Sequence, residues 1–475
     1  MARTETPASS VGFVPKLGLF DATMIVMGSM IGSGIFLAPS IMAGYLPVPQ
    51  LLLLLWALGG LLTAAGAVAY GELAGMMPRA GGQYVFLREA YGPLWGFLFG
   101  WTLFFVIQTG FIAAVAIAFA KYLGVFLPVL SEARVVARLP LGFATVAINS
   151  AQLVGVAVIA ALTLVNVLGV VFGAVVQNLF TVSKILAIAA LVVLAFALGD
   201  GSVAHWWAPL APHATRPLLP EAASLGFFAA FAVAMSKALF AYDAWNSATF
   251  AAEEVREAQR TIPRALVLGT LGVTAIYVAT NLAYLYLVPV HEMAAVPDNR
   301  IGEEAARRIL GQGGAAFIAA AILVSTFGCD NGLILAGPRV YYAMARDGLF
   351  FRAAGRLHPR FRTPVVSLVL QGVWASVLTL SGTYSALLTY TTFASLLFGA
   401  MTVAAVFVLR RRRPQASRPY RTPGYPVVPA LYILVAAFFI LYIVIGDPRS
   451  SGAGLLLVLL GLPAYAYWRR RQPAG

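Results

Sequence analysis

The 475-residue chain is poor in charge: 11% of its residues are charged, whereas 60% are hydrophobic. Soluble domains carry about a quarter charged residues, so this composition cannot cover several globular surfaces. The mean hydropathy is +0.85, and the apolar residues lie in runs of about twenty, the length that crosses a bilayer. Soluble enzyme folds are therefore excluded, and a polytopic membrane protein is indicated.

Cysteine, histidine and lysine are also scarce. The single Cys329 excludes an intrachain disulfide, and its apolar surroundings predict a small buried core residue. The four histidines lie far apart in predicted loops, which argues against a metal site, a cofactor or an enzyme. None of the four lysines is followed by Ser or Thr, so an ATP-driving phosphate loop is excluded in this chain.

Apolar runs that can cross a bilayer indicate about twelve helices. They start near positions 19, 50, 93, 150, 172, 225, 265, 314, 364, 385, 427 and 452. Sorting the basic residues between alternate loops gives 21 on one side and 8 on the other, with three inside spans. This bias predicts that both termini are cytoplasmic. Residues 1–18 lack a signal-peptide pattern, so we expect the first span to direct insertion.

The net charge of +14 is therefore accounted for by loops beside the bilayer, and no nucleic-acid partner is expected. Two blocks of five spans, 19–198 and 225–410, predict an inverted repeat because an odd number of spans reverses the second block. The expected connections are a cytoplasmic segment at 1–18, an extracytoplasmic loop at 199–224 and a basic cytoplasmic loop at 411–426. Helices 11 and 12 (427–468) and a cytoplasmic tail (469–475) follow.

The first helix of the first block is predicted to break. Gly32, Ser33 and Gly34 are consecutive small residues at mid-depth, and they do not form a single packing face, whereas Gly28 alone favours close helix packing. Unwinding there frees amide N–H groups on one side and carbonyls on the other. Such a break suits a zwitterion such as an α-amino acid.

The first helix of the second block carries Asp243 inside the membrane. Either this carboxylate is structural and binds backbone amides of a second broken helix, or it contacts substrate or a coupling ion. Phe240 and Trp245 flank this point and are candidate lids over a small ligand, although either could be an ordinary lipid-facing aromatic.

Further charges lie within spans. Lys184 lies too deep to reach the surface easily, and beside the carbonyls of an unwound helix 1 its ammonium could replace a bound Na⁺ and carry a proton. Lys237 is nearer the outer surface and is expected to snorkel. In helix 8, Ser325, Asp330 and Asn331 form a polar cluster that either touches ligand or braces the neighbouring helices.

Four segments resemble the amino acid–polyamine–organocation superfamily of transporters, in particular the L-type amino acid transporter branch and its bacterial relatives. They are GSMIGSGIF, MMPRAGGQYVFLREAYGPLWGFLFGW, FAYDAWNSATFAAEEVREAQRTIPRAL and FGCDNGLILAGPRVYYAMARDGLFF. The resemblance covers residues 15 to 470. It implies an all-α, LeuT-like fold of five plus five inverted helices, with helices 1 and 6 discontinuous, and alternating access to a central amino acid site.

The resemblance also implies roles for individual residues. Gly32, Ser33 and Gly34 would hold the substrate carboxylate, and the carbonyls of Met30, Phe240 and Asp243 its amino group. Phe240 would be the outer gate, and Asn246 would stabilise the broken part of helix 6. The complete expected set of site residues is Met30, Ile31, Gly32, Ser33, Gly34, Phe240, Ala241, Asp243 and Asn246 for substrate, Phe240 and Trp245 for gating, and Lys184, Ser325 and Asp330 for coupling.

Two departures from the family pattern concern the pocket and the partners. The usual glycine after the acidic position is Ala244 here, which predicts a slightly smaller side-chain pocket. The outer loop between helices 3 and 4 has no cysteine, so no disulfide-linked heavy chain is expected.

These observations predict transport of small to medium neutral L-amino acids across the plasma membrane, as in the cytoplasmic membrane of a bacterium. Both exchange and proton symport remain open, so H⁺ is a candidate partner. Two different functions are also compatible with the pattern. One is transport of cationic amino acids or polyamines, which the lack of an acidic cluster disfavours, and the other is a membrane amino acid sensor without transport.

Overall fold

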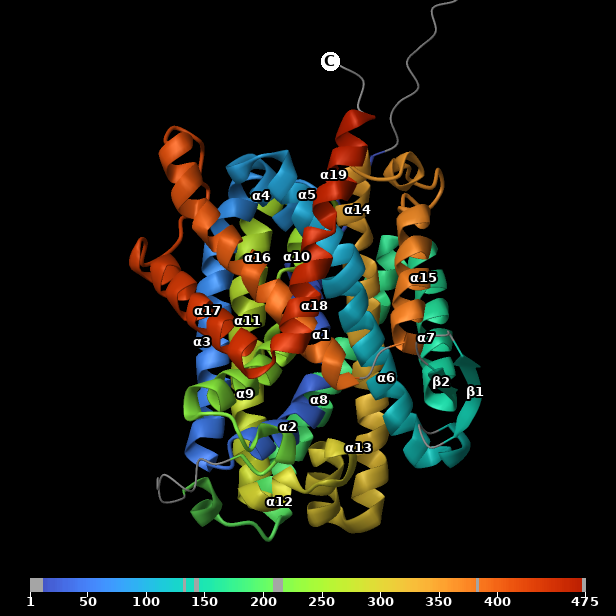
Figure 1. Cartoon of the computed structure of the whole chain (residues 1–475), viewed down its shortest axis with the longest axis vertical. Helices are drawn as coiled ribbons and strands as arrows, with labels where there is room; N and C mark the ends of the chain where they lie inside the picture. Colours follow the sequence, from blue (N-terminus) through green and yellow to red (C-terminus); the bar gives the residue numbers. More distant parts are fainter. Residues whose placement is uncertain (1–11, 131–133, 141–144, 208–216, 382–383, 472–475) are drawn as a thin grey trace, which may run out of the picture.

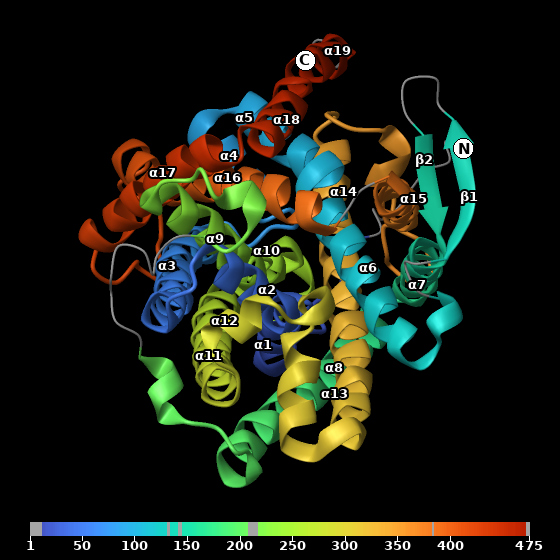
Figure 2. The same cartoon turned by 60° about the horizontal axis from the view of Figure 1, so that its bottom comes forward.

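The computed structural model describes residues 12–130, 134–140, 145–207, 217–381 and 384–471. Most of its long helices run roughly from top to bottom of Figure 1 and form a bundle, which other helices cross at a slant. When the molecule is turned so that the view is nearer to the direction of the bundle axis, α1 and α2 lie in the middle and other helices surround them (Figure 2). The first apolar run is thus the centre of the molecule.

The first half of the chain is helical apart from one hairpin. Its elements are α1 (Leu19–Met30), α2 (Gly34–Tyr45), α3 (Pro49–Met76), α4 (Gln83–Tyr91), α5 (Pro93–Thr102), η1 (Leu103–Ile107), α6 (Gln108–Phe126), η2 (Pro128–Leu130), β1 (Val135–Pro140), β2 (Thr145–Asn149), α7 (Ser150–Val167) and α8 (Val170–Leu198). The antiparallel strands β1 and β2 precede α7 and add a small sheet to a fold that is otherwise built of helices.

The second half continues with helices. Its elements are η3 (Val203–Trp206), η4 (Pro220–Ala222), α9 (Phe227–Tyr242), α10 (Ser247–Phe250), η5 (Ala252–Glu254), α11 (Ala258–Leu287), α12 (Val290–Ala294), η6 (Pro297–Asn299), α13 (Ile301–Ala336), α14 (Pro338–Arg346), η7 (Arg352–Gly355), α15 (Val365–Ser381), α16 (Tyr384–Arg412), α17 (Val427–Gly446), α18 (Pro448–Leu459) and α19 (Gly461–Arg470).

Ten stretches in the described part of the chain are long and apolar enough to cross a membrane. The shorter apolar helices α9 and α15 lie at the two remaining positions where the sequence predicts spans. The molecule is therefore an all-α membrane protein with one short hairpin. The assignment of the two five-helix blocks to an inverted repeat stays a prediction.

Burial separates the inner spans from the outer ones. The most apolar windows of Leu19–Tyr45 and Pro93–Phe126 are 94% and 89% buried within the protein, whereas the window of Val170–Leu198 is 28% buried. Since all three are apolar, the outer helix must face lipid while the first and third spans are enclosed by protein. Sequence hydropathy alone does not distinguish the two environments.

Two helices are interrupted midway along the bundle. The first apolar span is interrupted between α1 and α2 at residues 31–33. The sixth apolar span is interrupted between α9 and α10 around Asp243. The first break lies one residue earlier than predicted, since Gly34 is already the first residue of α2. The two broken helices pack together, with Gly34 against Ala241.

Candidate functional site

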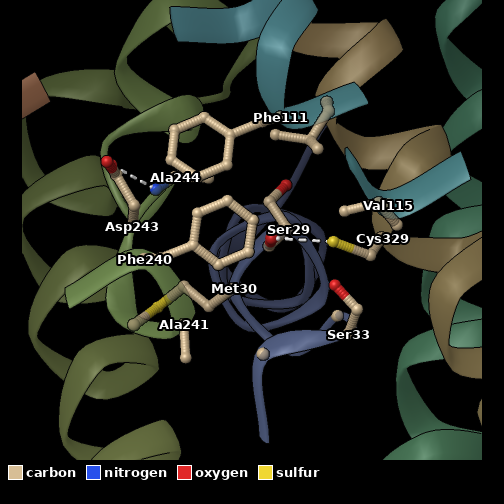
Figure 3. A pocket seen from close by; sticks show the side chains of 13 residues that line it. Ser29, Met30, Ser33, Phe111, Val115, Phe240, Ala241, Asp243, Ala244 and Cys329 are labelled. Atoms are coloured by element: carbon tan, nitrogen blue, oxygen red, sulfur yellow. Dashed lines mark hydrogen bonds between the residues drawn. The ribbon is translucent and has the colours of Figure 1, made fainter. Parts of the chain in front are cut away.

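A narrow cavity lies where the two helix breaks meet (Figure 3). Residues from α1, α2, α6, α9, α13 and both breaks form its wall. They are Ser29, Met30, Gly32, Ser33, Gly34, Phe111, Val115, Phe240, Ala241, Asp243, Ala244, Cys329 and Leu333. The free volume of about 10 Å³ is roughly the room that one water molecule requires. A larger ligand therefore needs the wall to move apart.

The carbonyl end of α1 is held by a buried lysine from α8. The Lys184 ammonium donates hydrogen bonds to the carbonyl oxygens of Gly28 (2.7 Å) and Ile31 (2.6 Å), and to that of Ser325 at 3.3 Å. The side chain is 1% exposed. These charge-assisted bonds satisfy carbonyls that the break would otherwise leave without intrahelical partners. The ammonium thus lies beside the first break, as the depth of Lys184 in the sequence suggested.

Side chains from two further helices bind the remaining carbonyls at this end. The Cys329 thiol of α13 lies 3.1 Å from the Ser29 carbonyl, and the Tyr277 hydroxyl of α11 donates to the Met30 carbonyl at 2.8 Å. The Ser325 hydroxyl donates to Ile31 at 3.3 Å. Each of the four carbonyls in residues 28–31 therefore has a donor from a distant part of the chain.

The start of α2 also borders the cavity, since its first residue, Gly34, is part of the lining. Helix starts present amide N–H groups and a partial positive charge, which favour an anionic ligand group. Gly34, the first residue of α2, packs so closely on α9 that an added Cβ would lie 2.5 Å from the Ala241 Cβ. Glycine is needed here for the approach of the two broken helices.

The second break is closed by neighbours in sequence. The Asp243 carboxylate accepts a hydrogen bond from the Ala244 amide at 2.6 Å, and the Ala244 carbonyl accepts one from the Ser247 amide at 3.1 Å. Ala244 has a φ of +63°, a conformation that favours glycine. This geometry is that of a structural carboxylate within a broken helix, although Asp243 also lines the cavity.

Two aromatic rings cover the cavity. Phe240 of α9 stacks on Phe111 of α6, with ring centroids 4.8 Å apart and planes at 30°. Figure 3 shows the Phe240 ring between Phe111 and Met30, with Ser29 at its side. The pair forms an apolar wall on one side of the cavity. The gating role of Phe240 remains a prediction, but its position fits that role.

Other predicted site residues lie outside the cavity lining. Trp245 packs edge-on against Tyr70, with centroids 4.6 Å apart, and lines a separate cavity beside Asp243. The Asn246 amide donates to Gln83 at 2.7 Å and so ties the second break to α4. Ile31, Lys184, Ser325 and Asp330 are absent from the lining as well.

Asp330 and Asn331 have different environments. Both are fully buried. The Asn331 amide donates to Gly173 and Gln177 of α8, each at 3.1 Å, and thereby braces α13. Neither carboxylate oxygen of Asp330 has a hydrogen-bond partner among the described residues. Since an unpaired charge is costly away from water, a neutral, protonated side chain suits this position.

The prediction that Lys237 snorkels to the surface is wrong. Its side chain is only 2% exposed, and it interacts electrostatically with Asp447 at the end of α17. Packing of α17 against α9 encloses this part of the span. Hydropathy could not reveal that a helix far along the chain covers Lys237.

Sequence reasoning missed several residues at the site. Phe111, Val115 and Leu333 line the cavity, and Tyr277 bridges the breaks by donating to both Met30 and Ala241 carbonyls, at 2.8 and 3.0 Å. They are single apolar or aromatic residues within long apolar spans, so no local signal distinguishes them from other core residues. Cys329 is buried as predicted, but it also lines the cavity.

The described residues contain no group of three or more His, Cys, Asp or Glu side chains placed to hold a metal ion. The cavity offers carbonyl ends, a helix start and an apolar wall, which suit a small zwitterion better than a reaction that needs a nucleophile and a base.

Discontinuous helices that meet around a mid-bundle cavity define the class of secondary membrane transporters. The sequence pattern of the amino acid permease family matches residues 17–460, so the chain belongs to that family and is a transporter rather than an enzyme.

Curated relatives align along nearly the whole chain. The serine/threonine exchanger SteT of Bacillus subtilis is 32% identical over 463 residues, which cover 97% of this chain and 98% of that protein. The b(0,+)-type amino acid transporter 1 of Mus musculus is 29% identical over 465 residues, covering 97% of this chain and 89% of the mouse protein. The Asc-type amino acid transporter 1 of Homo sapiens is 27% identical and covers 97% and 84% of the two chains.

Proposed function

We propose that this protein exchanges small neutral L-amino acids across the plasma membrane by alternating access. The observation that carries the proposal is the cavity at which both helix breaks meet. The similarity to a serine/threonine exchanger favours exchange over sensing without transport, and a small neutral substrate over a cationic one. Proton symport, which the sequence also permits, becomes one outcome of the test.

In this proposal the break of the first helix recognises the substrate backbone. The amides at Gly32, Ser33 and Gly34 bind the carboxylate, where the start of α2 adds a favourable dipole. The carbonyls of Met30, Phe240 and Asp243 accept hydrogen bonds from the ammonium group. Ile31 and Ala241 supply the backbone next to these binding groups at the two helix breaks. The Asn246 amide fixes the second break by donating a hydrogen bond to Gln83.

The wall chemistry favours a neutral side chain. Phe111, Val115 and Leu333 are apolar, and the one carboxylate in the lining, that of Asp243, already binds the Ala244 amide. A cationic side chain would find no free carboxylate in this lining. The Ala244 methyl occupies space that a glycine would leave, which favours a small substrate.

Gating and coupling complete the proposal. Phe240 and Phe111 separate to admit substrate and close over it, and Trp245 moves with the second break. Lys184 and Ser325 bind the Ile31 carbonyl, so movement of α1 relative to α8 and α13 changes the contacts of the ammonium. Asp330, which lies near this cluster in sequence, is the candidate for proton coupling if the protein is a symporter.

The orientation proposed from the basic residues places both termini in the cytoplasm. The arginines at the end of α16 and of α19, and those that precede α15, then face the cytoplasmic leaflet. Such arginines bind lipid headgroups and fix the orientation in the plasma membrane.

Flux into proteoliposomes tests the proposal. We expect internal serine, threonine or alanine to accelerate uptake of the same labelled amino acids, whereas internal lysine or putrescine should have no effect. Acceleration by an imposed pH gradient alone would replace exchange with proton symport. Binding without uptake under either condition would indicate an amino acid sensor and overturn the transport proposal.

A further inference from the structure

Another, wider cavity lies beside the loop that precedes α15. Figure 1 shows the start of α15 in the upper part of the molecule. Its volume is about 390 Å³. Three segments that are distant in sequence line it: the residues before α1, the turn between α7 and α8, and the loop before α15. It is separate from the central cavity and shares none of its lining residues.

The rim of this cavity is basic. Lys16, Arg360 and Arg362 line it and are exposed, and none of them forms an ion pair with a described carboxylate. The only carboxylate in the lining belongs to Glu254, which is 1% exposed and is bound by the Arg339 guanidinium at 2.8 Å. Three cations without counter-ions in the described part of the chain therefore meet at one opening.

The wall below the rim is apolar and faces outward. Val171, Phe172 and Val175 of α8 line the cavity and are 46%, 51% and 58% exposed. They are the first residues on the face of α8 that other helices leave exposed along the span. The cavity thus joins a cationic rim to a surface that acyl chains contact, which matches an amphiphile with an anionic headgroup.

The loop that carries the arginines is ordered by its own hydrogen bonds. The Arg362 amide donates to the His358 carbonyl at 2.9 Å, and the His358 amide donates to the Thr363 carbonyl at 2.8 Å. The Thr363 hydroxyl binds the Val167 carbonyl at the end of α7. Because the loop is held in place, a ligand bound by the two arginines loses little affinity to the entropy of ordering them.

We propose that this cavity binds an anionic phospholipid, with its phosphate between Lys16, Arg360 and Arg362 and its acyl chains along α8. The Lys16 and Leu17 amides donate to the Glu254 carbonyl at 2.8 and 2.9 Å, and α1 begins two residues later. The lipid therefore links the segment that leads into the broken first helix to the fixed loop before α15. It stabilises the conformation in which this segment lies against Glu254.

Lipid binding to the full-length protein tests this site. Native mass spectrometry in detergent, with phosphatidylglycerol as the probe, should show tight binding, and phosphatidylcholine should bind at least about tenfold more weakly. The double variant R360Q/R362Q should lose about thirtyfold in affinity for phosphatidylglycerol, since each arginine contributes about 1 kcal/mol. The matched control R134Q/R138Q removes two exposed arginines at the β1–β2 hairpin, which do not line this cavity, and should change the affinity less than twofold.

Two further results separate a lipid from a soluble anion. Phe172→Ser should weaken phosphatidylglycerol binding several-fold, because it removes apolar wall without changing charge. Glycerol phosphate at millimolar concentration should not displace the lipid. Displacement by glycerol phosphate, unchanged binding in Phe172→Ser, or equal losses in the arginine variant and its control would each overturn the proposal. The measurement needs no transport, so it stands or fails independently of the proposed exchange.

Discussion

The two helix breaks are held open by different kinds of contact. The carbonyl end of α1 binds side chains of α8, α11 and α13, which come from positions more than 150 residues further along the chain. The break after α9 is closed mainly within four residues, through the Asp243 carboxylate and the backbone of Ala244 and Ser247. Donors from distant helices hold the carbonyls of the first break, whereas the turn of the second break is closed by its own residues and is tied to α4 and α11 by the Gln83–Asn246 and Tyr277–Ala241 hydrogen bonds.

This difference assigns the two breaks different tasks. If α8 and α13 shift relative to α1, the carbonyls of the first break lose or exchange donors, so the first break can respond to movement of the scaffold. The turn at Asp243 is closed by hydrogen bonds within the break, so its local shape depends less on where the neighbouring helices lie. We therefore expect changes at the first break to affect transport and stability more than changes at the second.

Lys184→Met should have the largest effect. The variant leaves the Gly28 and Ile31 carbonyls without their ammonium donor, and we expect a loss of about 3 kcal/mol in the free energy of unfolding. Exchange in proteoliposomes should fall more than tenfold or change its pH dependence. Ser183→Ala is the control, since Ser183 binds only the Leu179 carbonyl of its own helix in the described structure. Equal behaviour of the two variants would refute long-range support of the first break.

Gly34→Ala should be the next most severe change. The new methyl would lie 2.5 Å from the Ala241 Cβ and 2.8 Å from its Cα, so the two broken helices must separate. We expect about 1–3 kcal/mol of destabilisation, measured by thermal unfolding, and loss of substrate binding. Gly452→Ala is the matched control because nothing lies within 4 Å of its added methyl. Wild-type substrate affinity in Gly34→Ala would show that close approach is not required.

Tyr277→Phe tests the one side chain that joins both breaks in the described structure. Loss of its hydroxyl removes hydrogen bonds to the Met30 and Ala241 carbonyls while keeping the buried ring. The expected cost is about 1–2 kcal/mol in unfolding free energy, with a several-fold slower exchange rate. Tyr467→Phe, at an exposed ring of α19, should leave both quantities unchanged. A variant with normal exchange would mean that the breaks move without this link.

Ala244→Gly should have the smallest effect on stability. Glycine relieves the positive φ but adds freedom to the unfolded chain, so the net change should stay within about 1 kcal/mol. Because the methyl lines the cavity, its removal should shift competition for uptake toward larger neutral amino acids such as leucine. Competition by unlabelled amino acids measures this shift. A large loss of stability would show that the turn of the second break needs the Ala244 methyl as well as its own hydrogen bonds.

Much of the fold and part of the site could be predicted from the sequence. The run of Gly32, Ser33 and Gly34 indicated a break to within one residue, and the depth of Lys184 indicated its place beside the freed carbonyls. Lys237 shows the limit of the same argument, because its burial depends on α17, which lies about 200 residues later in the chain. The position of a residue along its span can be read from the neighbouring sequence. Whether another helix covers that residue cannot be read in this way.

The sequence by itself determined the membrane character, the family and the position of the first break, because hydropathy, charge bias and consecutive small residues act locally. Only the tertiary structure decided which side chains meet at the cavity. Phe111, Tyr277 and Cys329 lie in long apolar spans, and neither their type nor their spacing shows that they meet at the cavity. Packing of distant helices brings these residues to the breaks, and that packing depends on long-range contacts.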